Sequence, residues 1–138
     1  MFLNRFWQKK KGKDPKSFLV SDEGFNPYMT VLVARRSFIN KNLETTQSLV
    51  SSVREGWRAY LDHPEKTNAF MHKLNSSVDL ESFHEIANAQ KPFVETAETK
   101  KSGLGVMNFQ RWKELANQLK EIGLIKAVPD VAQLFQNL

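Results

Sequence analysis

Residues 45–62 read TTQSLVSSVREGWRAYLD, and this stretch decides the fold class that the sequence predicts. Its large apolar residues recur every three or four positions, at Leu49, Val50, Val53, Trp57, Tyr60 and Leu61. That spacing places them along one side of an α-helix, whereas a half-buried strand would alternate apolar and polar residues. The sequence therefore predicts an amphipathic helix here, with its apolar side turned toward another part of the protein.

The same spacing predicts three further helices, over residues 64–74, 80–91 and 109–122. Asp62, Asp79 and Asn108 each precede a helical pattern, and their side-chain oxygens suit the N-cap position of a helix. Gly123 follows the last helix, where a left-handed C-terminal cap is expected. Pro92 is expected to end or kink the helix that begins at residue 80, because proline lacks the backbone N–H.

Residues 29–34, MTVLVA, are the best candidate for a strand. They are rich in β-formers and almost wholly apolar, a pattern typical of an interior strand that is covered on both faces. Residues 17–20, SFLV, are a weaker candidate. The sequence thus predicts a mainly α fold with one or two short strands, in a chain of 138 residues that has room for one domain.

The net charge of +5 is confined to the N-terminal end of the chain. Residues 1–20 hold six basic residues against one acid, whereas residues 21–138 hold fourteen of each sign. The six are Arg5, Lys9, Lys10, Lys11, Lys13 and Lys16. Such an arm is most often a solvated terminus, and the alternative is an arm that binds nucleic acid or an anionic membrane. Because no basic and aromatic pattern continues beyond residue 16, we expect no nucleic-acid partner.

The sequence predicts no catalytic residue, metal or cofactor, and therefore no enzyme. It has no cysteine, which excludes disulfides, thiol catalysis and thiolate metal sites. His63, His72 and His84 lack the spacing of metal ligands. Glu81 and Glu85 share a helical turn with His84, an arrangement that is typical of a solvated helix face, and the alternative is an acid–base group. No apolar run is long enough to span a membrane.

Several segments, taken in order, resemble the C-terminal part of the periplasmic substrate-binding proteins of ABC importers, in the nitrate/sulfonate/taurine and thiamine-pyrimidine-precursor group. The segments are VLVARRSFI at residues 31–39, GWRAYLDHPE at 56–65, GLGVM at 103–107, RW at 111–112 and LKEIGLI at 119–125. The resemblance runs from about residue 24 to residue 138. It implies the C-terminal portion of a two-lobe α/β periplasmic-binding-protein fold of type 2.

In that fold, residues 1–23 would be the basic arm and a remnant of the second lobe. Residues 24–138 would be the return strand and the C-terminal helices of the first lobe. The resemblance places residues 24–28 beside the hinge and the ligand cleft, with Gly24 as the hinge residue. It suggests Asn26 and Tyr28 as ligand contacts, and the alternative for these two residues is a plain turn and a packed ring.

The function implied by the resemblance is binding of a small organic or anionic nutrient, such as a sulfonate, nitrate or a thiamine pyrimidine precursor. The implied partners are that solute and an ABC permease, and the implied compartment is the periplasm. The sequence shows no signal peptide, so the chain as given is expected in the cytoplasm.

Because the family's first strands are missing from the sequence, we expect a truncated fragment that binds little solute by itself. We also expect it to self-associate, or else to be loosely packed. The alternative function is an independent helical interaction protein that uses its basic arm.

Overall fold

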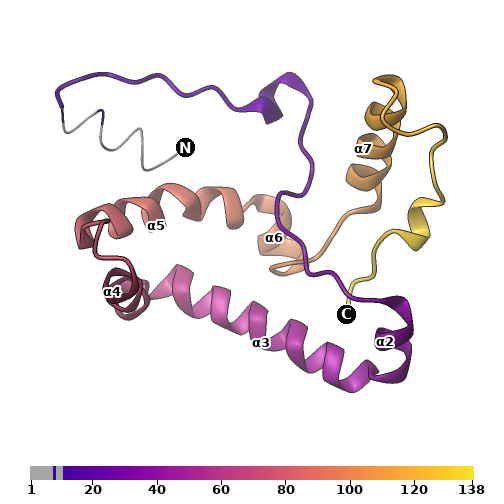
Figure 1. The fold of residues 1–138 in the computed structure, drawn as a ribbon, viewed down its shortest axis with the longest axis horizontal. Coiled ribbons are helices and arrows are strands. Elements are labelled where there is room, and N and C mark those ends of the chain that lie inside the picture. Colours follow the sequence, from indigo (N-terminus) through magenta and orange to yellow (C-terminus); the bar gives the residue numbers. More distant parts are fainter. Residues whose placement is uncertain (1–7, 9–10) are drawn as a thin grey trace. The chain divides into compact units, whose positions relative to one another are not determined.

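A computed structural model describes Gln8 and residues 11–138 of the chain, and within those residues all regular structure is helical. Figure 1 shows the succession of helices along the chain. The elements are η1 (Val20–Glu23), α2 (Arg36–Lys41), α3 (Leu43–Asp62), α4 (Glu65–Leu74), α5 (Leu80–Val94), α6 (Ala97–Ser102), α7 (Phe109–Glu121) and η2 (Val131–Gln133). The predicted mainly α class is therefore confirmed, and each of the four predicted helices is present within three residues of its expected bounds.

The chain forms two compact units, and α3 is divided between them after Val50. Unit 1 comprises Met1–Ser17 with Ser51–Gly105, and unit 2 comprises Phe18–Val50 with Val106–Leu138. Of the basic arm, Arg5, Lys9 and Lys10 lie outside the described residues. None of the described helices is both long enough and apolar enough to cross a lipid bilayer. The predicted division of the chain at residues 23 and 24 stays a prediction.

Unit 1 is built from the second half of α3 together with α4, α5 and α6, and α5 runs back in the direction opposite to α3 (Figure 1). The start of α5 is fixed by Asp79, whose side chain accepts a hydrogen bond from the Ser82 N–H at 2.8 Å. This confirms the predicted cap. Of the two outcomes predicted for Pro92, an end of the helix is wrong, since α5 continues to Val94, and a kink stays a prediction. At a position this close to the C-terminal end of a helix, a proline removes a single backbone hydrogen bond, and the last turn still forms.

The predicted cap at Asp62 is wrong. Asp62 is the last residue of α3, and the N-cap position of α4 is taken by Pro64 without a side-chain hydrogen bond. The Asp62 carboxylate instead accepts two hydrogen bonds from Arg58, one turn earlier in α3, at 2.8 and 2.7 Å. A charged guanidinium offers a carboxylate two parallel donors, which backbone N–H groups at a helix start do not offer in this geometry.

Unit 2 is organised by α7. The Asn108 side chain caps its start and accepts hydrogen bonds from the Gln110 and Arg111 N–H groups, as predicted. Gly123 follows its end with a φ of 75°, a left-handed conformation that glycine adopts without steric cost. The Leu124 N–H then reaches back to the Leu119 carbonyl at 2.9 Å, which completes the predicted cap.

The predicted strand at residues 29–34 is absent from the structure, as is the weaker one at 17–20. Residues 31–34 are an irregular segment after a bend at residues 29–30, and residue 20 begins the helical turn η1. Met29 and Val33 are 100% and 87% exposed. A strand is defined by hydrogen bonds to a neighbouring strand, and the described residues contain no second strand to provide them. The β-forming side chains of this segment are therefore not sufficient to make a strand.

Candidate functional site

The three residues predicted at the hinge and ligand cleft lie together in unit 2, against α7. Gly24 ends η1 with a φ of 85°, and its carbonyl accepts a hydrogen bond from the Gln118 side chain at 2.8 Å. The chain then continues through Asn26 and Pro27 to Tyr28. The positive φ of Gly24 makes the tight reversal that sends this segment along the N-terminal half of α7. The structure thus brings the three predicted residues into one place without testing their roles.

Arg111, in the first turn of α7, holds this segment. Its Nε donates to the Asn26 backbone carbonyl at 2.5 Å, and its Nη2 donates to the Asn26 Oδ1 at 2.7 Å and to the Pro27 carbonyl at 3.0 Å. All three acceptors are uncharged. No carboxylate lies within ion-pair distance of Arg111 in the described part of the chain. The guanidinium therefore retains its full positive charge beside the predicted ligand contacts.

Tyr28 is half-buried between Arg111 and the aromatic residues of unit 2. The guanidinium carbon of Arg111 lies 4.1 Å from the centre of the Tyr28 ring, which is cation–π geometry. The Tyr28 ring centre is 5.8 Å from that of Trp112, and the Trp112 ring stacks on Phe135 at 5.9 Å. The Tyr28 hydroxyl accepts a hydrogen bond from the Asn108 N–H at 2.6 Å. This hydroxyl still has its own hydrogen to donate.

Two side-chain donors remain available at this place. The Asn26 Oδ1 is engaged by Arg111, whereas its Nδ2 has no partner among the described residues. The Tyr28 O–H is the second donor. Together with the positive charge of Arg111, they suit a ligand that presents oxygen acceptors. Sequence reasoning missed the contribution of Arg111, although its position three residues after the predicted cap Asn108 placed it near the start of a helix.

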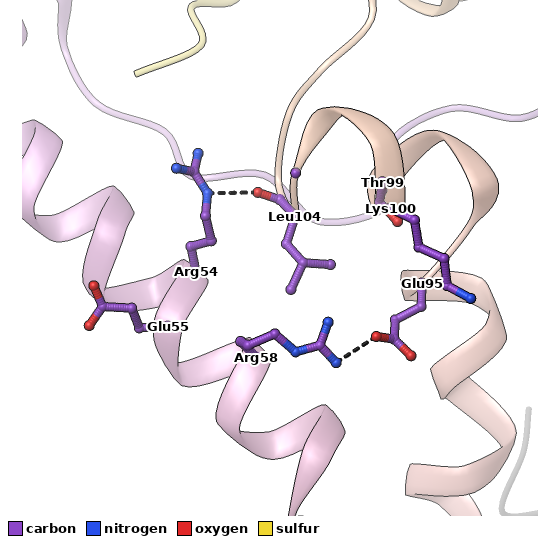
Figure 2. Close-up of a pocket in the computed structure, with 8 residues that line it drawn as sticks. Arg54, Glu55, Arg58, Glu95, Thr99, Lys100 and Leu104 are labelled. Atoms are coloured by element: carbon purple, nitrogen blue, oxygen red, sulfur yellow. Dashed lines mark hydrogen bonds and ion pairs between the residues drawn. The ribbon is translucent and has the colours of Figure 1, made fainter.

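Unit 1 contains a groove of about 430 Å³, lined by charged side chains from α3 and α6 and by Glu95, which follows α5 (Figure 2). In the groove, Arg58 Nη2 lies 2.5 Å from the Glu95 carboxylate, and Arg54 donates to the Leu104 carbonyl at 2.8 Å. Arg58 lowers the pKa of Glu95 and of Asp62 through hydrogen bonds to their charged forms. Both carboxylates therefore stay ionised and paired at neutral pH, which makes them poor proton acceptors for catalysis.

The three histidines occupy separate local settings in unit 1. His84 Nδ1 lies 3.2 Å from the Asn68 side-chain nitrogen, and His72 Nδ1 lies 2.7 Å from the Val78 carbonyl. His63 follows the end of α3 and is exposed. Glu81 and Glu85 are exposed on α5, as expected of a solvated face. No group of three or more His, Asp or Glu side chains in the described residues is arranged to hold a metal ion.

Part of the chain matches a known protein family. Residues 3–67 match the family described as NMT1/THI5 like. The match supports a relationship to the binding proteins for nitrate, sulfonates and thiamine precursors. It includes the predicted hinge residue Gly24, the predicted contacts Asn26 and Tyr28, and the segments at 31–39 and 56–65. The resembling segments beyond residue 67 lie outside it. Neither the curated proteins nor the solved structures contain a match.

Proposed function

We propose that this protein is a solute-binding component of an ABC importer. The observation that carries the proposal is the family match over residues 3–67, which includes the predicted contact residues. The family suggests a solute-binding role in transport. We propose a small organic or anionic nutrient as the solute, such as a sulfonate, nitrate or a thiamine pyrimidine precursor, and a permease as the protein partner. The proposed role is non-enzymatic and periplasmic.

In this proposal, Asn26 and Tyr28 contact the solute and Gly24 is the hinge. The geometry of unit 2 supports this assignment, because the Asn26 Nδ2 and the Tyr28 O–H are both unused donors. Arg111 adds a positive charge that no carboxylate in the described residues neutralises. Hydrogen-bond donors beside a guanidinium favour ligands that present acceptor atoms over apolar ligands. A sulfonate, nitrate and a pyrimidine all present such atoms.

We further propose that the chain alone binds such a solute weakly. Gly24, Phe25 and Asn26 are exposed, so water competes for the same donors. Binding sites for small molecules usually surround most of the ligand surface, and a site that covers one side forms fewer contacts. We therefore propose that tight binding requires a second surface that covers the other side of the solute.

The experiment is an NMR titration of the whole chain with nitrate, a small sulfonate and an aminopyrimidine, observing backbone and side-chain N–H resonances. We expect weak, saturable shifts at Asn26, Tyr28 and Arg111. The Asn26→Asp variant keeps an oxygen for Arg111 but loses the Nδ2 donor, so these shifts should disappear for the two anions. Asn117→Asp adds the same charge at an exposed position of α7 and serves as the control.

Three outcomes would each contradict one part of the proposal: the weak binding by the chain alone, the position of the solute site, or the solute-binding role. Micromolar affinity for any of these solutes would show that the chain has a complete site by itself. Shifts confined to the groove of unit 1, or unchanged in Asn26→Asp, would show that residues 24–28 are not the solute site. Retention of the chain on heparin that disappears with salt would favour the helical interaction protein that uses its basic arm.

A further inference from the structure

Asn137 makes two hydrogen bonds to the backbone of Met107, in the linker of unit 2 that precedes α7. The Asn137 Oδ1 accepts from the Met107 N–H at 2.8 Å, and the Asn137 Nδ2 donates to the Met107 carbonyl at 2.9 Å. Only one orientation of the side-chain amide satisfies both bonds. Residues 106–108 lie outside every helix, so this amide takes the place of the partner that regular structure would supply. Asn137 therefore fixes the linker at Met107.

The Met107 carbonyl belongs to the same peptide group as the Asn108 N–H, which donates to the Tyr28 hydroxyl at 2.6 Å. In a trans peptide group the carbonyl and the N–H point in opposite directions, so Asn137 binds one end of the group and Tyr28 the other. The Asn137 Nδ2, the peptide group and the Tyr28 hydroxyl form a line of hydrogen bonds in which each member donates to the next. The line ends at the Tyr28 O–H, which has its own hydrogen to donate.

This line of hydrogen bonds acts on the Tyr28 hydroxyl in two ways. The Asn108 N–H occupies one side of the phenolic oxygen, so the hydroxyl hydrogen turns to the other side. A carbonyl that accepts a hydrogen bond also polarises the N–H of its own peptide group, and this strengthens the bond that follows. The Tyr28 O–H is thereby directed, and it is a stronger donor than it would be without Asn137.

The ring of Tyr28 is held from the same part of the chain. Phe135, two residues before Asn137, stacks on Trp112 with ring centres 5.9 Å apart and an angle of 11° between the rings. Trp112 in turn lies against the Tyr28 ring, with ring centres 5.8 Å apart. The Trp112 Nε1–H is buried and has no hydrogen-bond partner in the described residues. Its exchange with solvent therefore reports whether this layer of rings stays closed.

We propose that Asn137 is a positioning residue of the candidate solute site, which directs the Tyr28 O–H toward an acceptor of the solute. The step from this O–H to the solute rests on the proposed function, whereas the position of the hydroxyl does not. The role requires the amide. Asn137→Asp keeps the acceptor for the Met107 N–H but loses the donor to the Met107 carbonyl, whereas Asn137→Gln carries both groups on a longer side chain.

The first measurement needs no solute. NMR of the whole chain follows the Asn108 amide resonance and the solvent exchange of the Trp112 indole N–H. In Asn137→Ala, we expect the Asn108 amide to move upfield, because its hydrogen bond to Tyr28 weakens, and the Trp112 exchange to accelerate several-fold. Asn137→Asp should move the Asn108 amide in the same direction, and Asn137→Gln should restore part of the native position.

Gln136 provides matched controls, because it is exposed and adjacent to Asn137. Gln136→Ala repeats the truncation and Gln136→Glu repeats the added charge, and both should give the native resonances. Helical circular dichroism should be unchanged in every variant at these two positions, since both lie outside every helix. An Asn108 amide and a Trp112 exchange rate that are the same in Asn137→Ala as in the native chain would overturn the proposal.

The second measurement is a nitrate titration of Asn137→Ala, Tyr28→Phe and the double variant. Asn137→Ala should weaken nitrate binding by roughly three- to ten-fold, the loss expected for one hydrogen bond. In the Tyr28→Phe background it should have no further effect, because the hydroxyl through which it acts is gone. Equal weakening in both backgrounds would overturn the positioning role, since a general loss of stability does not depend on the hydroxyl. Absence of nitrate shifts in the native chain would overturn the proposed function alone, because the first measurement decides the position of Tyr28.

Discussion

The two units of this chain differ in which kinds of side chain they bury and which they expose. Unit 1 buries polar residues completely: Asn68 and Ser82 are both 0% exposed. Unit 2 leaves apolar residues in solvent, and fifteen of the twenty large hydrophobic residues that are exposed among the described residues belong to it. The difference teaches that the buried amide of Asn68 finds its partners within unit 1, whereas the residues of unit 2 lack partners for much of their apolar surface.

The polar core of unit 1 works as a short relay of hydrogen bonds across three helices. The Tyr60 hydroxyl, on α3, donates to the Asn68 Oδ1 on α4 at 3.0 Å, and the Asn68 Nδ2 faces the His84 Nδ1 on α5 at 3.2 Å. Burial raises the pKa of the Tyr60 hydroxyl, which keeps it protonated and able to donate at neutral pH. One amide thus satisfies groups from two neighbouring helices.

The largest effect is expected from Asn68→Ala, which removes the centre of this relay. It would leave the Tyr60 hydroxyl and the His84 ring nitrogen without a partner, and each such loss costs roughly 1–3 kcal/mol, so we expect about 3 kcal/mol of destabilisation. Urea unfolding followed by circular dichroism measures the change in the free energy of unfolding. Asn88→Ala makes the same truncation at an exposed position of α5 and should have little effect.

Ser82 supplies a matched control inside the same core. Its Oγ is buried and has no hydrogen-bond partner in the described residues, so Ser82→Ala removes no hydrogen bond. Its effect on the free energy of unfolding should be close to zero or slightly stabilising. If Asn68→Ala and Ser82→Ala had equal effects, the stability of unit 1 would depend on packing at these positions and not on the hydrogen-bond relay.

A second, smaller effect is expected from Arg111→Ala in unit 2. The substitution removes the hydrogen bonds to Asn26 and Pro27 and the contact with the Tyr28 ring, and we expect about 2 kcal/mol of destabilisation. Arg111→Lys keeps the charge but loses the planar fork of donors, so it should restore only part of the loss. Near-UV circular dichroism reports the Tyr28 and Trp112 environment. An unchanged aromatic signal in Arg111→Ala would show that α7 holds residues 24–28 without this side chain.

Comparison of the sequence predictions with the two units shows what local pattern can and cannot reveal. The long helices were predictable, because apolar spacing and the caps at Asp79 and Asn108 act within a few residues. The short helix α6 carried a local signal that was missed, since Thr96 and Thr99 form a capping box at its start. With hindsight, a Thr three residues after a Thr could have predicted this helix.

The other differences arise from contacts between residues distant in sequence. The segment at residues 29–34 has strand-forming side chains, but whether it becomes a strand depends on a partner elsewhere. Arg111 lies 85 residues from Asn26, and no local pattern links the two. The resemblance therefore suggested Gly24, Asn26 and Tyr28, whose roles stay predictions, while Arg111, which holds this segment, could not be found from spacing.

The smallest expected effect concerns pH and the ion pairs of Arg58 in unit 1. Arg58 lowers the pKa of Asp62 and Glu95 in the folded protein, so both carboxylates bind protons less readily folded than unfolded. Their contribution to stability is therefore complete above the unfolded pKa values, at roughly pH 4, and is lost as the pH falls through the lower folded values. The Arg58 and Asp62 side chains are 42% and 47% exposed, which keeps the effect small and sensitive to salt.

The measurement is the thermal midpoint of the native chain and of Arg58→Gln at pH 7 and near pH 3, at low and high salt. The native chain should be the more stable of the two at pH 7, and the difference should shrink at low pH, where the carboxylates are protonated. Lys66→Gln also removes one positive charge, but Lys66 has no ion pair in the described structure. The difference in thermal midpoint between this variant and the native chain should therefore not shrink at low pH. If Arg58→Gln and Lys66→Gln gave the same pH dependence, the net charge of unit 1 would be responsible. In that case the relay through Asn68 would be the remaining specific polar interaction of unit 1 in its contrast with the exposed apolar residues of unit 2.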